Sequence, residues 1–300
     1  MSGEKEKKRV ILDIEPRTQW ENGHGFCGET ALQSIGLYYG CWISQQLTRS
    51  INEGELLITD DGNDADTLET LLFKFEKWNF KEEAQPQFQR HCMWLKKHLV
   101  QRHPCIIAVY IADTEEIDDD YDHIMPAIGI QYSESDDKYD PQDVLLFYNL
   151  FDLKLLERQL GTNDMVKTRR TCKSTTDTGG CLPQQINYGY AILGIKDEQK
   201  TTVPVRLKVS MSHEPNLSTG ASPVIMQGTI AVFTLVRGRN YAILRYNSYK
   251  QVPESGDNEA FLRSNYHSRH EFRAESDTYS YVDPEGIPSN GSIYYRCVPI

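Results

Sequence analysis

The sequence has no apolar stretch that approaches the roughly 20 residues a membrane-spanning helix requires, and we expect no association with a membrane. Residues 1–9 lack the apolar core of a secretory signal, which predicts a cytoplasmic protein with reduced cysteines. Positive charge is also scarce, because 32 Lys and Arg stand against 43 Asp and Glu, a formal net charge of -11. Since neutralising phosphates needs a basic face, we expect no nucleic-acid partner.

Cysteine pairs with metal-binding spacing are missing as well. The seven cysteines are scattered, and neither a Cys-x-x-Cys pair nor a Cys/His spacing typical of zinc occurs. We therefore expect neither a metal nor an organic cofactor. What the chain does contain is an ordinary globular composition, 39% hydrophobic and 25% charged in 300 residues. That length is enough for two hydrophobic cores.

One cysteine stands in a setting that indicates nucleophilic chemistry. Cys27 lies in the segment GFCGETAL, residues 25–32, where a small-residue approach leads into an apolar, helix-compatible run. We predict a helix over residues 27–40 that ends at Gly40. A thiol in the first turn of a helix feels the positive end of the helix dipole, which favours the nucleophilic thiolate.

Two later runs supply the remaining groups that cysteine catalysis needs. His123 begins the apolar run 123–131, and Asn149 lies near the end of the run 143–151. In such catalysis a thiol attacks, an imidazole takes and returns the proton, and an amide or carboxylate fixes the imidazole tautomer. Cys27, His123 and Asn149 fit these roles in chain order.

These segments resemble a known family. The segment GFCG at 25–28, followed by a helix, resembles the nucleophile segment of papain-like cysteine peptidases. DHIMPAIGI at 122–130 is similar to their histidine strand, and LLFYN at 145–149 and NYGYAIL at 187–193 resemble the asparagine strand and the Gly-Tyr strand after it. The short path from histidine to asparagine also resembles the bacteriocin-leader-processing (double-glycine) branch, whose orienting residue is Asp. The resemblance covers roughly residues 15–197.

The chain departs from the family at the oxyanion hole. The family's glutamine usually lies about six residues before the cysteine, where this chain has Glu21. A carboxylate cannot donate a hydrogen bond to a developing oxyanion, whereas a side-chain amide can. Gln19 is therefore our first candidate for this role, and Asn22 is the alternative.

A second departure follows the asparagine. The family often has Trp two residues after it and Gly next to that, but this chain has Phe151 and Asp152. Asp152 is therefore an alternative orienter to Asn149. Asn247, in the segment NSY at 247–249, is a third candidate that lies much further along the chain.

An acidic segment leads directly into the histidine. Residues 113–122 contain Asp118, Asp119 and Asp120, and such a run is usually a solvated loop. The alternative is that these carboxylates form the rim of the substrate cleft. There they would favour a basic peptide and raise the pKa of the imidazole of His123.

The order of elements predicts an α+β protein, with a helical half followed by a strand-rich half, as in the papain-like fold. After a mobile tail at 1–9, we place the peptidase-like domain at 10–197, with an insertion at 153–186. Residues 203–300 form a β-rich extension or a small β-sandwich. The expected helices are 27–40, 67–78 and 88–101, and the expected strands are 9–14, 104–112, 123–131, 143–151, 188–195, 203–211, 228–236, 240–246, 279–282 and 292–298.

The resemblance implies a thiol hydrolase, most simply a peptidase, that acts on a peptide or protein through an acyl-enzyme. Two alternatives stay open. The acyl-enzyme could pass its acyl group to an amine or thiol, as in the transglutaminase-like and phytochelatin-synthase-like relatives. Alternatively, the scaffold could be inactive and serve as a protein-binding module, with the β-rich part as its recognition surface.

Overall fold

The structure is a computed structural model, and it describes residues 7–19, 25–54, 61–110, 123–133, 137–150, 152–161, 182–183, 186–211 and 226–300. The chain forms two compact units. The first consists of Met1–Ser34, Glu55–Asp64 and Lys74–Gly194, and the second of Ile35–Gly54, Ala65–Phe73 and Ile195–Ile300. The last segment of the second unit begins at Ile195, close to the predicted boundary between residues 197 and 203. Two earlier segments of the chain also belong to this unit.

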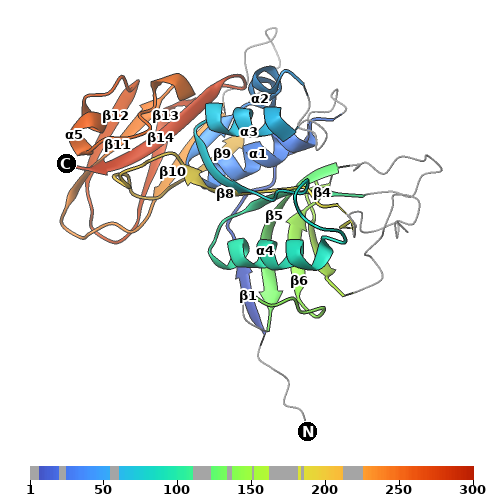
Figure 1. Cartoon of the computed structure of the whole chain (residues 1–300). Helices are drawn as coiled ribbons and strands as arrows, with labels where there is room; N and C mark the ends of the chain where they lie inside the picture. Colours follow the sequence, from blue (N-terminus) through green and yellow to red (C-terminus); the bar gives the residue numbers. More distant parts are fainter. Residues whose placement is uncertain are drawn as a thin grey trace. The chain divides into compact units, whose positions relative to one another are not determined.

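The first unit is built on one sheet with the strand order β3-β8-β4-β5-β6-β7, and β1 pairs with β5 (Figure 1). Pairing is antiparallel between β1 and β5, between β8 and β4, and along β4-β5-β6-β7. The strands are β1 Lys8–Ile11, β3 Phe73–Lys77, β4 Cys105–Val109, β5 His123–Tyr132, β6 Val144–Tyr148, β7 Leu155–Gln159 and β8 Gly189–Ile195.

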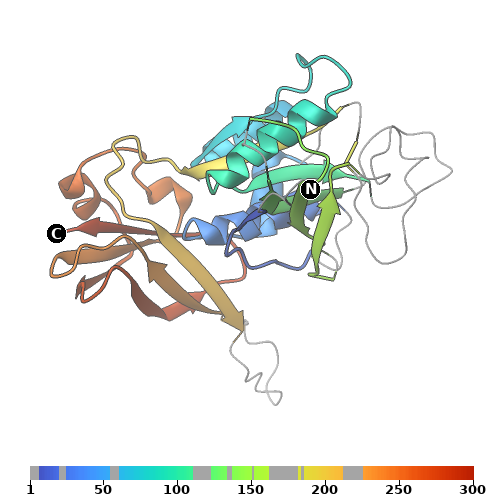
Figure 2. The same ribbon diagram turned by 90° about the horizontal axis from the view of Figure 1, so that it is seen from below.

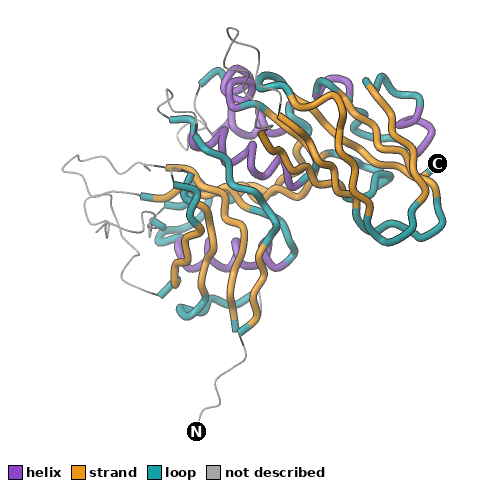
Figure 3. Tube along the Cα trace, turned by 180° about the vertical axis from the view of Figure 1, so that it is seen from behind, coloured by secondary structure: helices purple, strands orange, loops and turns teal. Residues whose placement is uncertain are grey.

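The core of the first unit lies between this sheet and helix α4, Phe88–Val100. The helix contributes Cys92, Leu95 and Leu99, whose spacing places them on one helical face. The strands contribute alternate residues such as Met125 and Ala127, as expected for one face of a sheet. Figure 3 shows α4 from behind, as a purple helix lying against the orange strands. The predicted helix at 88–101 is confirmed.

The second unit contains two sheets, with the orders β13-β10-β9 and β12-β11-β14-β2. Their later strands are drawn in yellow to red in Figure 2. A single hydrophobic cluster includes Leu207 and Ile230 of the first sheet and Ile243 and Ile293 of the second, so the two sheets form a sandwich. The strands are β2 Cys41–Ile43, β9 Val205–Met211, β10 Met226–Val232, β11 Asn240–Tyr246, β12 Ser268–Arg273, β13 Tyr279–Ile287 and β14 Ser292–Pro299.

The other helices are short. They are α1 Cys27–Tyr38, α2 Gln45–Asn52, α3 Asp61–Thr70, α5 Asn258–Leu262 and the 3-10 turn η3 Tyr249–Gln251. Among the helices of the described residues, none is long and apolar enough to cross a membrane. Helices and antiparallel sheets together make the protein an α+β protein, as the order of elements predicts.

One expectation about the elements in the first half of the chain is wrong. Residues 67–78 are not one helix, because α3 ends at Thr70 and β3 follows, pairing with β8. Leu72 between them has a φ of 64°, which no helix continues through. Within the predicted insertion at 153–186, β7 extends the sheet beside β6, and the sequence analysis did not predict this strand.

In the second unit, the predicted strands 228–236 and 240–246 do not pair with each other across the turn at 237–239. β10 pairs with β9 and β13, whereas β11 pairs with β12 and β14. The turn therefore carries the chain from one sheet of the sandwich to the other.

Candidate active site

Helix α1 begins at Cys27, as the sequence predicts. The carbonyl of Phe26 accepts hydrogen bonds from the N–H of Thr30 at 2.9 Å and from its hydroxyl at 2.7 Å, which closes the first turn. The N–H groups of a first turn have no partner within the helix. The side chain of Cys27 is therefore held beside donors at the positive end of α1, and the residue is 9% exposed.

The thiol of Cys27 meets the start of strand β5. The backbone N–H of Ile124 donates a hydrogen bond to its Sγ at 3.3 Å. His123, the first residue of β5, directly precedes Ile124 and is 3% exposed. The fold thus brings the sulfur within one residue of the histidine that the sequence pairs with it, although the two lie far apart along the chain.

Burial governs the protonation of this pair. Burial raises the pKa of Cys27 to about 11, and the charge of Glu29 acts in the same direction, while hydrogen bonds from the N–H groups of Ile124 and Gly28 act against it. Burial also lowers the pKa of His123 to about 4. The expectation that the helix dipole yields a resting thiolate is therefore wrong, because desolvation of the charge outweighs it. At neutral pH the site holds a neutral thiol and a neutral imidazole.

Asn149 directly follows β6, the strand next to β5. Ala127 of β5 is paired with Phe147 of β6, so continuing this register places Asn149 opposite Met125. Paired residues project to the same face, and His123 shares that face with Met125 by strand alternation. The half-buried Asn149 is thus on the neighbouring strand and near the level of the histidine.

Asp152 lies in the exposed turn between β6 and β7. Its carboxylate accepts a hydrogen bond from the N–H of Lys154 at 3.1 Å and forms an ion pair with Nζ of Lys154 at 3.0 Å. These hydrogen bonds to Lys154 lower the pKa of Asp152. The carboxylate is therefore oriented by a surface lysine, and Asn149 is the better placed of the two candidates to orient His123.

Gln19 is held close to the end of β6. Its backbone N–H donates to the carbonyl of Leu150 at 3.4 Å, and the N–H of Arg17 donates to the hydroxyl of Ser34 on α1 at 3.1 Å. The segment 17–19 is thus tied both to helix α1, which begins at Cys27, and to the residues that follow β6. This brings Gln19, the first oxyanion candidate, into the same region of the first unit.

Several sequence candidates lie outside the described residues, namely Asn22, Glu21, Phe151 and the acidic segment with Asp118, Asp119 and Asp120. Asn247 belongs to the second unit, where its side-chain oxygen accepts a hydrogen bond from Nε of Arg245 at 2.9 Å.

Sequence reasoning missed three buried polar residues of the first unit. Glu29 lies in the first turn of α1, and Tyr188 donates a hydrogen bond from its hydroxyl to the carboxylate of Asp64 at 2.6 Å. Glu29 lies in the segment GFCGETAL and Tyr188 in the segment NYGYAIL. A polar residue within a segment that resembles the family is a signal by which the sequence could have identified both. Nothing in the local sequence around Asp64 marks it.

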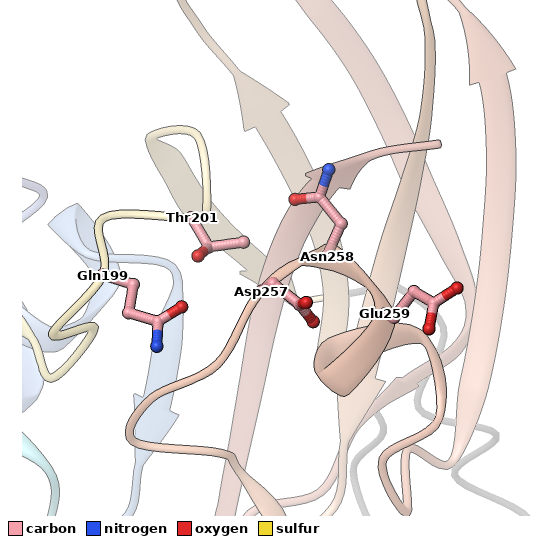
Figure 4. A pocket seen from close by; sticks show the side chains of 5 residues that line it. All are labelled: Gln199, Thr201, Asp257, Asn258 and Glu259. Atoms are coloured by element: carbon pink, nitrogen blue, oxygen red, sulfur yellow. The ribbon is translucent and has the colours of Figure 1, made fainter.

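A pocket of about 380 Å³ in the second unit is lined by Gln199, Thr201, Asp257, Asn258 and Glu259 (Figure 4). All five lining residues have polar side chains, and none of them is a cysteine or histidine. In the parts of the chain that the structure describes, no group of three or more His, Cys, Asp or Glu is arranged to hold a metal ion.

Comparison with models of known protein families found no family that matches this chain. A search of the curated proteins found no match either. The assignment of a function therefore rests on the arrangement of the residues.

Proposed function

We propose that the protein is a papain-like thiol hydrolase, most simply a peptidase, with Cys27 as nucleophile, His123 as general base and Asn149 as the residue that orients His123. The observation that carries the proposal is the hydrogen bond from the N–H of Ile124 to the sulfur of Cys27, because Ile124 directly follows His123 in β5. A cysteine that is buried only for packing would not be expected at the start of a helix, next to a strand that begins with a histidine and close to a strand that is followed by an asparagine.

In the resting site Cys27 is a thiol and His123 is an unprotonated base. A neutral imidazole is able to accept a proton at neutral pH, and the pKa of about 4 keeps His123 neutral there. As Sγ of Cys27 bonds to the carbonyl carbon of the substrate, the thiol proton passes to His123. The neutral pair becomes an imidazolium and a tetrahedral oxyanion without a preformed ion pair.

The later steps return that proton. The oxyanion collapses, the C–N bond of the substrate breaks, and the imidazolium gives its proton to the leaving amine. Water then attacks the acyl-enzyme, with His123 again as base, and the C–S bond breaks to release the acid and restore the thiol. The oxyanion is stabilised by the side-chain amide of Gln19 and the backbone N–H of Cys27.

The substrate is a peptide or protein, and the net charge of -11 favours a basic one. The chemistry uses no metal or organic cofactor. Adding a primary amine to the assay separates hydrolysis from acyl transfer, because a transferase gives an amide product in place of the free acid.

The test uses a library of unstructured peptides, read by mass spectrometry, with the full-length protein and three variants. Cys27→Ala and His123→Ala are each expected to abolish turnover. Cys297→Ala removes another buried cysteine, in the second unit, and is expected to leave turnover unchanged. Retention of full activity by Cys27→Ala would falsify the proposal.

One observation favours a second candidate, an inactive scaffold that binds a protein partner. Both proposed reacting groups are buried and neutral, with the pKa of Cys27 raised to about 11 and that of His123 lowered to about 4. A site that has lost its chemistry would keep this arrangement for packing alone. Under this candidate no peptide is cleaved, and a partner is bound equally well by the protein and by Cys27→Ala.

A further inference from the structure

Three exposed arginines lie together at one end of the β-sandwich in the second unit. Arg237 and Arg239 belong to the loop between β10 and β11, and Arg273 is the last residue of β12. Nε of Arg273 donates a hydrogen bond to the carbonyl of Gly238 at 3.1 Å. The third arginine is therefore held against the loop that carries the other two.

These three arginines differ from others of the second unit in their charge partners. Several arginines elsewhere in this unit each form an ion pair with a carboxylate, namely Arg245, Arg263, Arg269 and Arg296. Within the part of the chain that the structure describes, no ion pair joins Arg237, Arg239 or Arg273 to a carboxylate, although Glu275 and Asp277 follow Arg273 closely in the sequence. Acidic residues outnumber basic ones by 43 to 32 in the whole chain, so this local group of unpaired positive charges is unexpected.

The backbone of the loop is fixed by hydrogen bonds and by a buried anchor. The N–H of Gly238 donates to the carbonyl of Ala274 at 2.8 Å, and the N–H of Ala274 donates to the carbonyl of Arg239 at 2.9 Å. Leu235, in the first part of the loop, is buried and belongs to the core of the sandwich. A partner that binds the loop therefore does not have to order its backbone, which lowers the entropic cost of binding.

Two exposed aliphatic side chains accompany the arginines. Val236 is 59% exposed and directly precedes Arg237, and Ile300 is 41% exposed. The N–H of Ile300 donates to the carbonyl of Asn240 at 3.0 Å, which places Ile300 beside the end of the loop. Arginine is enriched in protein–protein interfaces, and their buried centres are apolar. We call the following residues the arginine surface: Val236, Arg237, Arg239, Arg273 and Ile300.

We propose that the arginine surface is a docking site for an acidic segment of a partner protein. A guanidinium group binds a carboxylate through two parallel hydrogen bonds, so Asp and Glu side chains are well matched to it. The aliphatic side chains of Val236 and Ile300 favour a segment in which apolar residues stand among the acidic ones. This partner is distinct from the basic substrate proposed for the first unit, and its binding does not involve Cys27.

The overall charge of the chain favours a protein segment over a membrane or a nucleic acid. A net charge of -11 repels an extended anionic surface, because most of the protein is then brought close to like charge. A short acidic segment meets only the arginine surface, where the local charge is positive.

The test measures the binding of a rhodamine-labelled peptide of repeated Glu-Asp-Leu to the full-length protein by fluorescence anisotropy. The unmodified protein is expected to bind the peptide, and added salt is expected to weaken the binding. The double variant Arg237→Gln, Arg239→Gln is expected to raise the Kd about tenfold, because two charge-assisted contacts are lost. Arg263→Gln is the matched control and is expected to leave the Kd unchanged, since it removes an exposed arginine of the same unit that is paired with Glu259.

A second variant tests the apolar part of the surface. Val236→Ser is expected to weaken the binding of this peptide but not that of a peptide with Ser in place of each Leu. Thermal unfolding checks that every variant is folded.

Three results would overturn the proposal. They are the absence of binding by the unmodified protein, an unchanged Kd in the double variant, and tighter binding of single-stranded DNA or of vesicles of phosphatidylserine and phosphatidylcholine than of the peptide at the same salt concentration. The last result would make the surface a site for polyanions instead of a protein segment. The measurement needs no turnover, so it does not depend on whether Cys27 is catalytic.

Discussion

Lys96 and Asp143 form an ion pair inside the first unit, with 2.7 Å between Nζ and Oδ2 and only 1% of each side chain exposed. Lys96 lies on α4, and Asp143 directly precedes β6, the strand that Asn149 directly follows. Nζ of Lys96 also donates to the carbonyl of Lys138 at 3.0 Å. The pair thus ties the helix beneath the sheet to the strand that carries the proposed orienting residue.

Replacing Lys96 by Met is expected to destabilise the protein strongly. The substitution keeps the apolar stem but leaves the carboxylate of Asp143 buried without its cation, which costs about 3–5 kcal/mol. Urea unfolding measures the change. Arg9→Met is the control, because Arg9 and Glu157 form an ion pair at the surface, and exposed pairs contribute about 0–1 kcal/mol. Equal losses in the two variants would contradict the expectation.

Cys27 is expected to react slowly with iodoacetamide at neutral pH in the unmodified protein. With its pKa raised to about 11, the thiol is almost wholly protonated at pH 7, and only the thiolate attacks the reagent. The rate of modification of the Cys27 peptide, measured from pH 6 to 11 by mass spectrometry, should rise throughout this range. A plateau already reached below pH 8 would mean that Cys27 and His123 form an ion pair at rest.

The stability of the protein is expected to fall as the pH drops below about 6.5. Burial lowers the pKa of His91 to about 3 and that of His123 to about 4 in the folded protein. Between those values and the ordinary pKa of about 6.5, the unfolded chain binds protons that the folded chain does not. Each histidine then costs roughly 2 kcal/mol at pH 4.5.

Urea unfolding at pH 7.0 and at pH 4.5 measures this loss. His91→Phe retains a ring between Trp78 and Trp94 but cannot take up a proton, so the loss between the two pH values should shrink by about half. An unchanged loss in His91→Phe would show that other groups cause the acid sensitivity.

The sequence predicts the elements around the site well, because their signals are local. A helix that begins at Cys27 and ends before Gly40, and apolar runs that become β4, β5, β6 and β8, are visible in patterns of a few residues. Helix α4 has the regular spacing of a helix with one buried face. The approach of Cys27 to His123 was inferred from the order of motifs, and the hydrogen bond to Ile124 agrees with it.

What the sequence does not reveal depends on distant partners. Leu68, Leu71, Leu72 and Phe75 fit helical spacing, yet Phe75 is in a strand because β8 offers hydrogen bonds to β3. The protonation of Cys27 depends on how deeply the fold buries it, which no spacing reports. The buried pair of Asp64 and Tyr188 joins residues 124 positions apart, so neither residue marks the other in the sequence.

Gly40 is a residue at which one added methyl group should disturb the second unit. It follows α1 with a φ of +74°, and a Cβ there would lie 2.9 Å from Cγ1 of Val205 on β9. Gly40→Ala is therefore expected to lower the free energy of unfolding by about 1–3 kcal/mol, through both the strained φ and the overpacking. Gly54→Ala is the matched control, since a Cβ at Gly54 meets nothing within 4 Å. Denaturation in urea compares the two, and a loss in Gly40→Ala no larger than in Gly54→Ala would mean that β9 does not pack against Gly40 as described.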